Sequence, residues 1–221
     1  MRSHVMVLVV MAILVPARVA MAADGPALAG VRGKLLNPGT VLVDHEDPGT
    51  MKPAMAEGST SEVVTPANDD RMPVPKAVRV SVGKAYPTPY AVQLFSADTA
   101  VALNKGDTVL MSCWIRAPQA AEGQSGLAAF WLQTTGPKWA SVAGVTTACG
   151  RAWKQVFATG TADRDYPAGS LQVAIHLGQQ RQVLEFAGLL VLNLGPGVDP
   201  RKLPRTPIVW GGMEADAPLA G

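Results

Sequence analysis

Residues 171–177 read as a strand whose polar side chains suit recognition chemistry. Apolar residues alternate there with Gln172 and His176, which is the period of a strand with one dry face and one wet face. A wet face that carries glutamine and histidine, instead of lysine and glutamate, suits hydroxyl-rich ligands. Sugars are the obvious candidates.

Other strand-like segments repeat this alternation with similar side chains. An indole offers a flat apolar platform for a sugar ring, while amides and guanidinium groups are forks that can hold two neighbouring hydroxyls. One such hydrogen bond contributes only about 1 kcal/mol, so several must act together. Outward positions of neighbouring strands form one continuous surface. We therefore predict one binding sheet that carries Gln93, Trp114, Arg116, Trp131, Gln133, Gln172 and His176.

Each of these residues also has a purely structural interpretation. Indoles such as Trp114 and Trp131 commonly pack between sheets. Gln93 and Arg116 can satisfy backbone groups at a sheet edge, and His176 can be a structural hydrogen-bonding group. The alternation alone leaves both interpretations open.

Aromatic residues in loops add further candidates. Trp139 follows residues 134–138, a turn-rich segment between strands, and an exposed loop tryptophan has no core to join. Tyr86 and Tyr90 bracket Pro87-Thr88-Pro89 in a similar way. We predict that Trp139 stacks on the ligand, with the two tyrosines as related candidates.

The positions of the strands predict an all-β protein. Expected strands cover residues 40–44, 76–82, 90–95, 108–116, 126–134, 154–160, 171–177 and 183–193, and 22 Gly and 18 Pro favour short strands with many turns. This spacing predicts an antiparallel β-sandwich of the jelly-roll type. We expect a signal peptide at 1–22, a loose arm with one strand at 23–72, the sandwich at 73–194 and a linker-like tail at 195–221.

The N-terminus has the pattern of an export signal. Arg2 precedes an apolar run over residues 5–15, and Ala20-Met21-Ala22 has the small-x-small form of a cleavage site. The run is about half the length that a membrane-spanning helix needs. We expect a secreted or periplasmic protein, with no membrane partner after cleavage, that is a monomer. A net charge of +2 and the lack of basic runs argue against nucleic acid as a partner.

Two cysteines, Cys113 and Cys149, leave their redox state open. Export to an oxidising compartment favours a disulfide, whereas the core-facing strand position of Cys113 suits a buried free thiol. Neither residue has the spacing of a zinc site or the neighbours of a catalytic nucleophile.

The strand sequences, taken in order, resemble a known family. They are similar to the galactose-binding-like jelly rolls of carbohydrate-binding module families 4, 9 and 22, above all to the module that precedes the catalytic barrel in some bacterial family 10 xylanases. The resemblance covers about residues 75–218. The segments that carry it are 90–94, 105–107, 113–117, 153–157, 166–169, 176–178 and 182–185, with 198–206 and 212–218 similar to the end of that xylanase module.

The chain departs from this pattern in two respects. The barrel that follows in those xylanases would need about 250 residues, and only three residues follow Pro218. Such modules also often hold a structural calcium, yet the last strand here reads Glu185-Phe186-Ala187-Gly188 where the family commonly has paired Asp. Asp44 and Glu46 remain as candidate ligands for a calcium ion.

The function implied by the resemblance is non-catalytic binding of a β-linked plant polysaccharide such as xylan or β-glucan. The alternative is a structural or protein-interaction jelly roll without sugar binding. We expect no catalytic residues, because Gly-x-Ser-x-Gly and His-Glu-x-x-His motifs are missing. The carboxylate cluster at residues 44–47 is interpreted as a solvated loop, although Asp44 and Glu46 would be the pair to test for catalysis.

Overall fold

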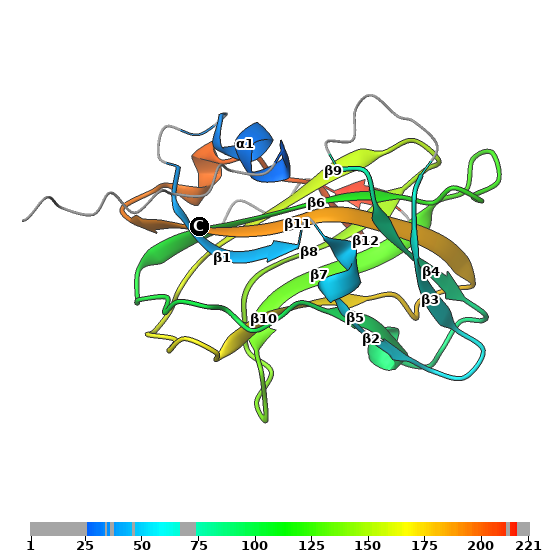
Figure 1. Ribbon diagram of the computed structural model, residues 1–221, viewed down its shortest axis with the longest axis horizontal. Coiled ribbons are helices and arrows are strands. Elements are labelled where there is room, and N and C mark those ends of the chain that lie inside the picture. The colour runs from blue at the N-terminus through cyan, green and yellow to red at the C-terminus, as the bar shows by residue number, and fades with distance from the viewer. Residues whose placement is uncertain are drawn as a thin grey trace, which may run out of the picture.

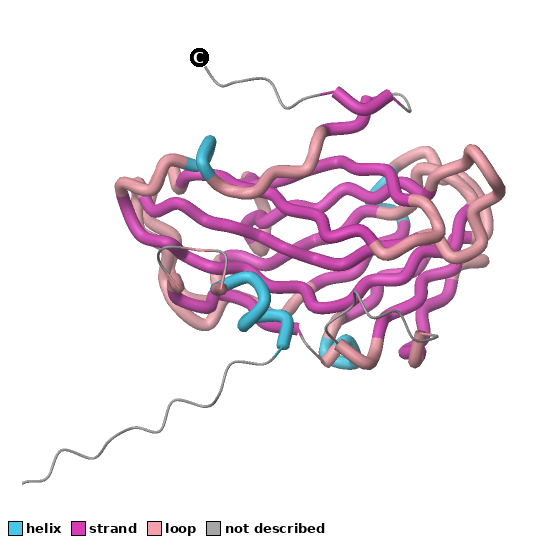
Figure 2. Tube along the Cα trace, turned by 90° about the horizontal axis from the view of Figure 1, so that it is seen from above, coloured by secondary structure: helices cyan, strands magenta, loops and turns pink. Residues whose placement is uncertain are grey.

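Two antiparallel sheets face each other across one apolar core (Figure 1, Figure 2). The computed structural model describes residues 26–33, 35, 38–45, 47–66, 74–210 and 213–215. The predicted signal peptide at 1–22 lies outside these residues. The predicted all-β antiparallel sandwich is confirmed.

Sheet A has six strands and sheet B has five. In sheet A the order is β3 (Thr60–Val64), β4 (Ala77–Val82), β11 (Gln182–Pro196), β6 (Asp107–Arg116) and β9 (Lys154–Thr161), and β1 (Thr40–His45) pairs with the second half of β11. In sheet B the order is β2 (Lys52–Met55), β5 (Val92–Phe95), β10 (Leu171–His176), β7 (Gly126–Thr134) and β8 (Ser141–Cys149).

Short elements complete the described chain. They are the helix α1 (Pro26–Arg32), the 3-10 turns η1 (Pro48–Thr50), η2 (Pro89–Ala91) and η3 (Pro200–Lys202), and a hairpin of β12 (Ile208–Trp210) and β13 (Met213–Ala215). No helix within the described residues is long and apolar enough to cross a membrane.

The segment expected to be a loose arm is largely structured. Instead of one strand it supplies α1, β1, β2 and β3, and its strands pair with β11, β5 and β4. The strands β2 and β3 were missed because they are short and mostly exposed, so neither shows a clear alternation, and each lies at a sheet edge where pairing with another strand defines it. The strand β8 was also missed.

Part of the predicted C-terminal linker packs against the sandwich as well. Val198 and Leu203 contact an apolar cluster on sheet A. The Thr206 hydroxyl accepts a hydrogen bond from the Phe157 backbone N–H at 2.8 Å, and the Thr108 hydroxyl donates to the carbonyl of Val198 at 2.8 Å. These contacts fix residues 198–206 against β6 and β9.

Side chains on the inner faces of both sheets form the main core. Val109, Met111 and Ile115 of β6 are buried within it. Phe130 of β7 meets Phe186 of β11 edge to face, with 6.0 Å between ring centroids, so this pair joins the two sheets.

Sheet A is also covered on its outer face. Val31 of α1, Leu110 of β6 and Leu192 of β11 belong to one apolar cluster there, and Trp153 and Ala187 belong to another. Burial on both sides explains why residues 189–194 of β11 are almost continuously apolar.

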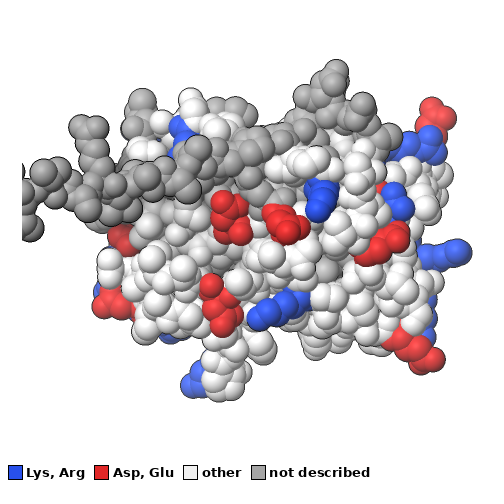
Figure 3. Space-filling model, viewed as in Figure 1, with Lys and Arg blue, Asp and Glu red and all other residues white. Residues whose placement is uncertain are grey.

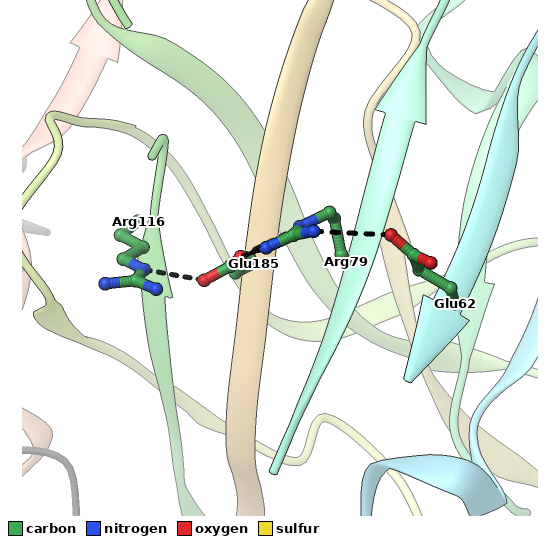
Figure 4. A network of polar contacts seen from close by, with 4 residues as sticks. All are labelled: Glu62, Arg79, Arg116 and Glu185. Carbon is green, nitrogen blue, oxygen red and sulfur yellow. Dashed lines mark hydrogen bonds and ion pairs between the residues drawn. The ribbon is translucent and has the colours of Figure 1, made fainter. Parts of the chain in front are cut away.

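A buried carboxylate lies in the outer layer of sheet A, between two arginines (Figure 4). Glu185 is fully buried and accepts hydrogen bonds at 2.6 Å from both Arg79 Nη2 and Arg116 Nε. Arg79 Nη1 reaches the exposed Glu62 at 3.4 Å, and the Arg116 guanidinium lies 4.7 Å from the ring centroid of Trp153. The network joins β3, β4, β11 and β6.

Both cysteines are buried free thiols in the structure, which is the arrangement that the free-thiol alternative expects. Cys113 lies on β6 of sheet A and Cys149 on β8 of sheet B. Burial raises the pKa of each thiol to about 12, which keeps both protonated at neutral pH.

His45 connects the end of β1 to the segment that follows β5. Its Nε2 accepts a hydrogen bond from the Ala97 backbone N–H at 3.0 Å, so the proton is on Nδ1, which donates to the Thr50 hydroxyl. Burial holds the pKa of His45 below its ordinary value of 6.5. His45 is therefore a neutral structural group at pH 7.

Replacing Glu185 by Ala should lower the free energy of unfolding by about 3 kcal/mol, because Arg116 is left largely buried without its partner. Urea denaturation measures this loss. Glu62→Ala, at the exposed end of the same network, should cost less than about 0.5 kcal/mol. Equal losses for the two variants would contradict a stabilising role of the buried carboxylate.

The unfolding free energy should decrease as the pH falls below 6.5, the ordinary histidine pKa. His45 has a lowered pKa in the folded state, so below this pH the unfolded chain binds more protons and becomes favoured. Denaturation between pH 8 and pH 5 measures the slope. It should be smaller in His45→Gln, and an unchanged slope in that variant would show that His45 does not cause it.

Candidate functional site

The outer face of sheet B carries most of the predicted binding residues. In register, Gln93 of β5 lies opposite His176 of β10, and Gln172 of β10 lies opposite Gln133 of β7. Trp131 is on the same face of β7, between these two rows. The structure brings these five residues to one surface, which supports the alternation argument for their placement; their role in binding stays a prediction.

This surface contains a depression of about 420 Å³. Its lining comes from β5, β10, β7, the turn η2 and the loop between β7 and β8, and consists of Tyr90, Gln93, Phe95, Gln133, Trp139 and His176. Phe95 was missed in the sequence, although it follows Gln93 by two residues and so shares its face. No carboxylate is among these lining residues.

Two exposed aromatic side chains stand at the rim of the depression. Tyr90 is 56% exposed and Trp139 is 60% exposed. The Tyr90 ring meets the His176 ring edge to face at 6.1 Å. Rings held open to solvent in this way can stack on an incoming ligand.

The loop that presents Trp139 is closed by Thr134 at the end of β7. The Thr134 hydroxyl donates to the Lys138 carbonyl at 2.6 Å and accepts from the Ala140 backbone N–H at 3.0 Å. The loop also turns through Gly136, whose φ of 115° is one that glycine adopts without strain. These contacts project Trp139 away from the core.

Polar groups in the depression are left without protein partners. Within the part of the chain that the structure describes, no hydrogen bond is formed by the side-chain amides of Gln93 and Gln133 or by the ring nitrogens of His176, although Gln133 is only 7% exposed. The structural interpretation of Gln93 and His176 thus finds no support. Their donors and acceptors are available to a ligand.

His176 is a neutral imidazole at pH 7. Burial lowers its pKa below the ordinary value of 6.5. The neutral ring has one nitrogen that donates and one that accepts a hydrogen bond, which matches the dual character of a hydroxyl group.

Trp131 lies against the backbone of the neighbouring strand. A Cβ atom added to Gly144 of β8 would come within 2.1 Å of Cε3 of the Trp131 indole, so this packing requires glycine. The ring is only partly buried, which leaves indole surface exposed beside the depression. Trp131 thus provides a further apolar platform on the same face.

The expectation that Trp114 and Arg116 share this surface is wrong. Both lie on β6, which pairs with β11 and β9 in sheet A. Trp114 packs against a buried cluster of that sheet, and Arg116 is held by Glu185. Alternation identified their face of the strand correctly, but it carries no information about which sheet the strand joins.

The candidate calcium ligands are only partly described. Asp44 is exposed near the end of β1, and Glu46 lies outside the described residues. Glu185, at the position where the family has Asp, is bound to arginines. Over the described ranges no group of three or more His, Cys, Asp or Glu side chains could hold a metal ion.

A second hollow, of about 460 Å³, lies at one end of the sandwich. It is lined by glutamine, serine, glycine and small apolar residues together with Arg181, and the side chain of Gln182 forms hydrogen bonds to the backbone of Leu127 and Leu177. No aromatic side chain lines it. The depression on sheet B is therefore the better candidate for ligand binding.

Comparisons with known proteins find similarity in fold. No protein-family model and no curated protein matches the sequence. A CBM4 structure is 19% identical over 66% of this chain and 96% of its own, with a TM-score of 0.49. The CBM22-1 xylan-binding domain of Paenibacillus barcinonensis Xyn10C is 10% identical over 71% of this chain and 96% of its own, with a TM-score of 0.45.

The N-terminal cellulose-binding domain of Cellulomonas fimi β-1,4-glucanase C is 18% identical over 67% of this chain and 91% of its own, with a TM-score of 0.47. At these identities the likeness concerns the fold alone. The protein matches solved structures of carbohydrate-binding modules in its β-sandwich fold.

Proposed function

We propose that this protein binds a β-linked polysaccharide, such as xylan or β-glucan, on the outer face of sheet B without cleaving it. The observation that carries the proposal is the depression with exposed Tyr90 and Trp139 at its rim and unpaired Gln93, Gln133 and His176 within it. The export pattern at residues 2–22 supports a secreted or periplasmic location.

The chemistry of the depression fits a sugar chain. Its aromatic rings can bury the apolar C–H faces of sugar rings, which supplies most of the favourable free energy. The amides and the neutral imidazole can exchange hydrogen bonds with hydroxyl groups, each contributing about 1 kcal/mol. A volume of about 420 Å³ lies within the range of small-molecule sites.

The arrangement of strands favours a chain over a single sugar. The surface continues from β5 across β10 and β7 to β8, and Trp131 extends it beyond the depression. Four strands spaced about 4.8 Å apart span about 14 Å. A polymer lying across the strands would contact both the rim aromatics and Trp131.

Binding without cleavage agrees with the composition of the depression. Glycoside hydrolysis ordinarily uses a pair of carboxylates on either side of the scissile bond. The described lining residues include neither Asp nor Glu. The uncharged lining therefore favours a surface that binds a sugar chain without cleaving it, as in the family that the sequence resembles.

Trp139→Ala should weaken polysaccharide binding at least about tenfold, because it removes an exposed stacking surface without disturbing the core. Gln93→Ala should weaken it about fivefold through lost hydrogen bonds. Affinity electrophoresis and calorimetry on xylan, β-glucan and cellulose provide the measurements.

Gln119→Ala is the matched control, since Gln119 is exposed and lines the hollow at the end of the sandwich. It should bind like the wild type. If the folded wild type is not retarded by any polysaccharide, the proposal fails and the alternative of a structural or protein-binding jelly roll gains support.

Binding should be constant from pH 8 down to 6.5 and weaken at lower pH, as the pH falls through the lowered pKa of His176 in the free protein. A ligand that covers His176 favours its neutral form, so protonation must compete with binding. Calorimetric titrations across this range, at pH values where circular dichroism shows a folded protein, test this expectation. His176→Gln should give a flatter profile, whereas an identical pH dependence would exclude His176 as its cause.

A further inference from the structure

A lysine on the edge strand β2 lies beside the depression on sheet B, and a second lysine, Lys138, precedes Trp139 in the loop after β7. Lys52 of β2 pairs in register with Phe95 of β5, and Phe95 lines the depression. Side chains directly opposite each other on antiparallel strands share a face, with Cβ atoms about 5 Å apart. The exposed Lys52 side chain therefore borders the depression at the β2 edge of the sheet.

Lys52 has no charged neighbour on the strands of sheet B. It is the only Asp, Glu, Lys or Arg residue in the five strands of sheet B. Among the described residues it has no ion-pair partner and no side-chain hydrogen bond. Sheet A differs, since Arg79 and Arg116 on it are both held by Glu185.

Protection of the sheet edge does not require this charge. Lysine on an edge strand can prevent pairing with another chain. The next residue, Pro53, already lacks the backbone N–H group that such pairing would use. Edge protection therefore does not explain why a cation stands on strands that are otherwise uncharged.

Building on the proposed function, we propose that Lys52 selects polysaccharides that carry carboxylate substituents, such as uronic acid side groups on a neutral main chain. The uncharged lining of the depression suits the neutral main chain. The Lys52 ammonium group, on a flexible four-carbon stem, can reach a carboxylate that projects from the chain towards β2.

The test compares glucuronoxylan with the same polymer after enzymatic removal of its uronic acids. Wild-type protein should bind the acidic polymer about two- to fivefold more tightly, as expected for an exposed ion pair. This preference should disappear in 0.5 M salt, because the pair is exposed to solvent. Lys52→Gln should bind both polymers equally and match the wild type on the neutral one.

Lys76→Gln is the charge-matched control. Lys76 is exposed and precedes β4 of sheet A, so this variant should keep the preference. Equal wild-type affinity for the two polymers overturns the role of Lys52 but leaves the proposed function intact. A preference that persists in Lys52→Gln also overturns it, and failure to bind either polymer overturns both proposals.

Discussion

Sheet A is buried on both of its faces, and this burial determines which surface of the sandwich can meet a ligand. Helix α1 and residues 198–206 cover one part of its outer surface, while Trp114, Trp153 and Val74 cover another. Among the described residues, the outer face of sheet B is the broad sheet surface that no other segment covers. The depression on this face has an uncharged lining with exposed aromatic side chains at its rim, so recognition can take place there.

Polar side chains also differ between the outer faces of the two sheets. On sheet A the charged side chains satisfy one another, as Glu185 does with Arg79 and Arg116, because an unpaired charge in a buried layer is costly. On sheet B the amides of Gln93 and Gln133 and the ring of His176 have no partner among the described residues. Such groups contact water in the free protein, so a ligand can bind them at a small net cost. Figure 3 shows acidic and basic side chains scattered among uncharged ones on one face of the molecule.

Small residues are as important to the open face as large ones. Gly144 allows the Trp131 indole to lie against β8, and the buried Ala174 lies in register between Phe95 and Trp131. Across the sandwich, a Cβ atom on Gly160 of β9 would come within 1.9 Å of the Val142 carbonyl oxygen, so glycine lets the two sheets close together at the β8–β9 edge. The shape of the binding face thus depends on where side chains are missing as well as on where they project.

Alternation along the sequence predicts the fold class, eight of the strands and the outward position of Gln93, Trp131, Gln133, Gln172 and His176, because it is a local property of a strand. It did not reveal β2, β3 and β8, whose polar or small residues become strands through pairing with distant partners or through contact with an aromatic ring. It also placed Trp114 and Arg116 on the wrong surface. Only the tertiary structure decides which sheet a strand joins and which face the rest of the chain covers, since both depend on contacts between residues far apart in the sequence.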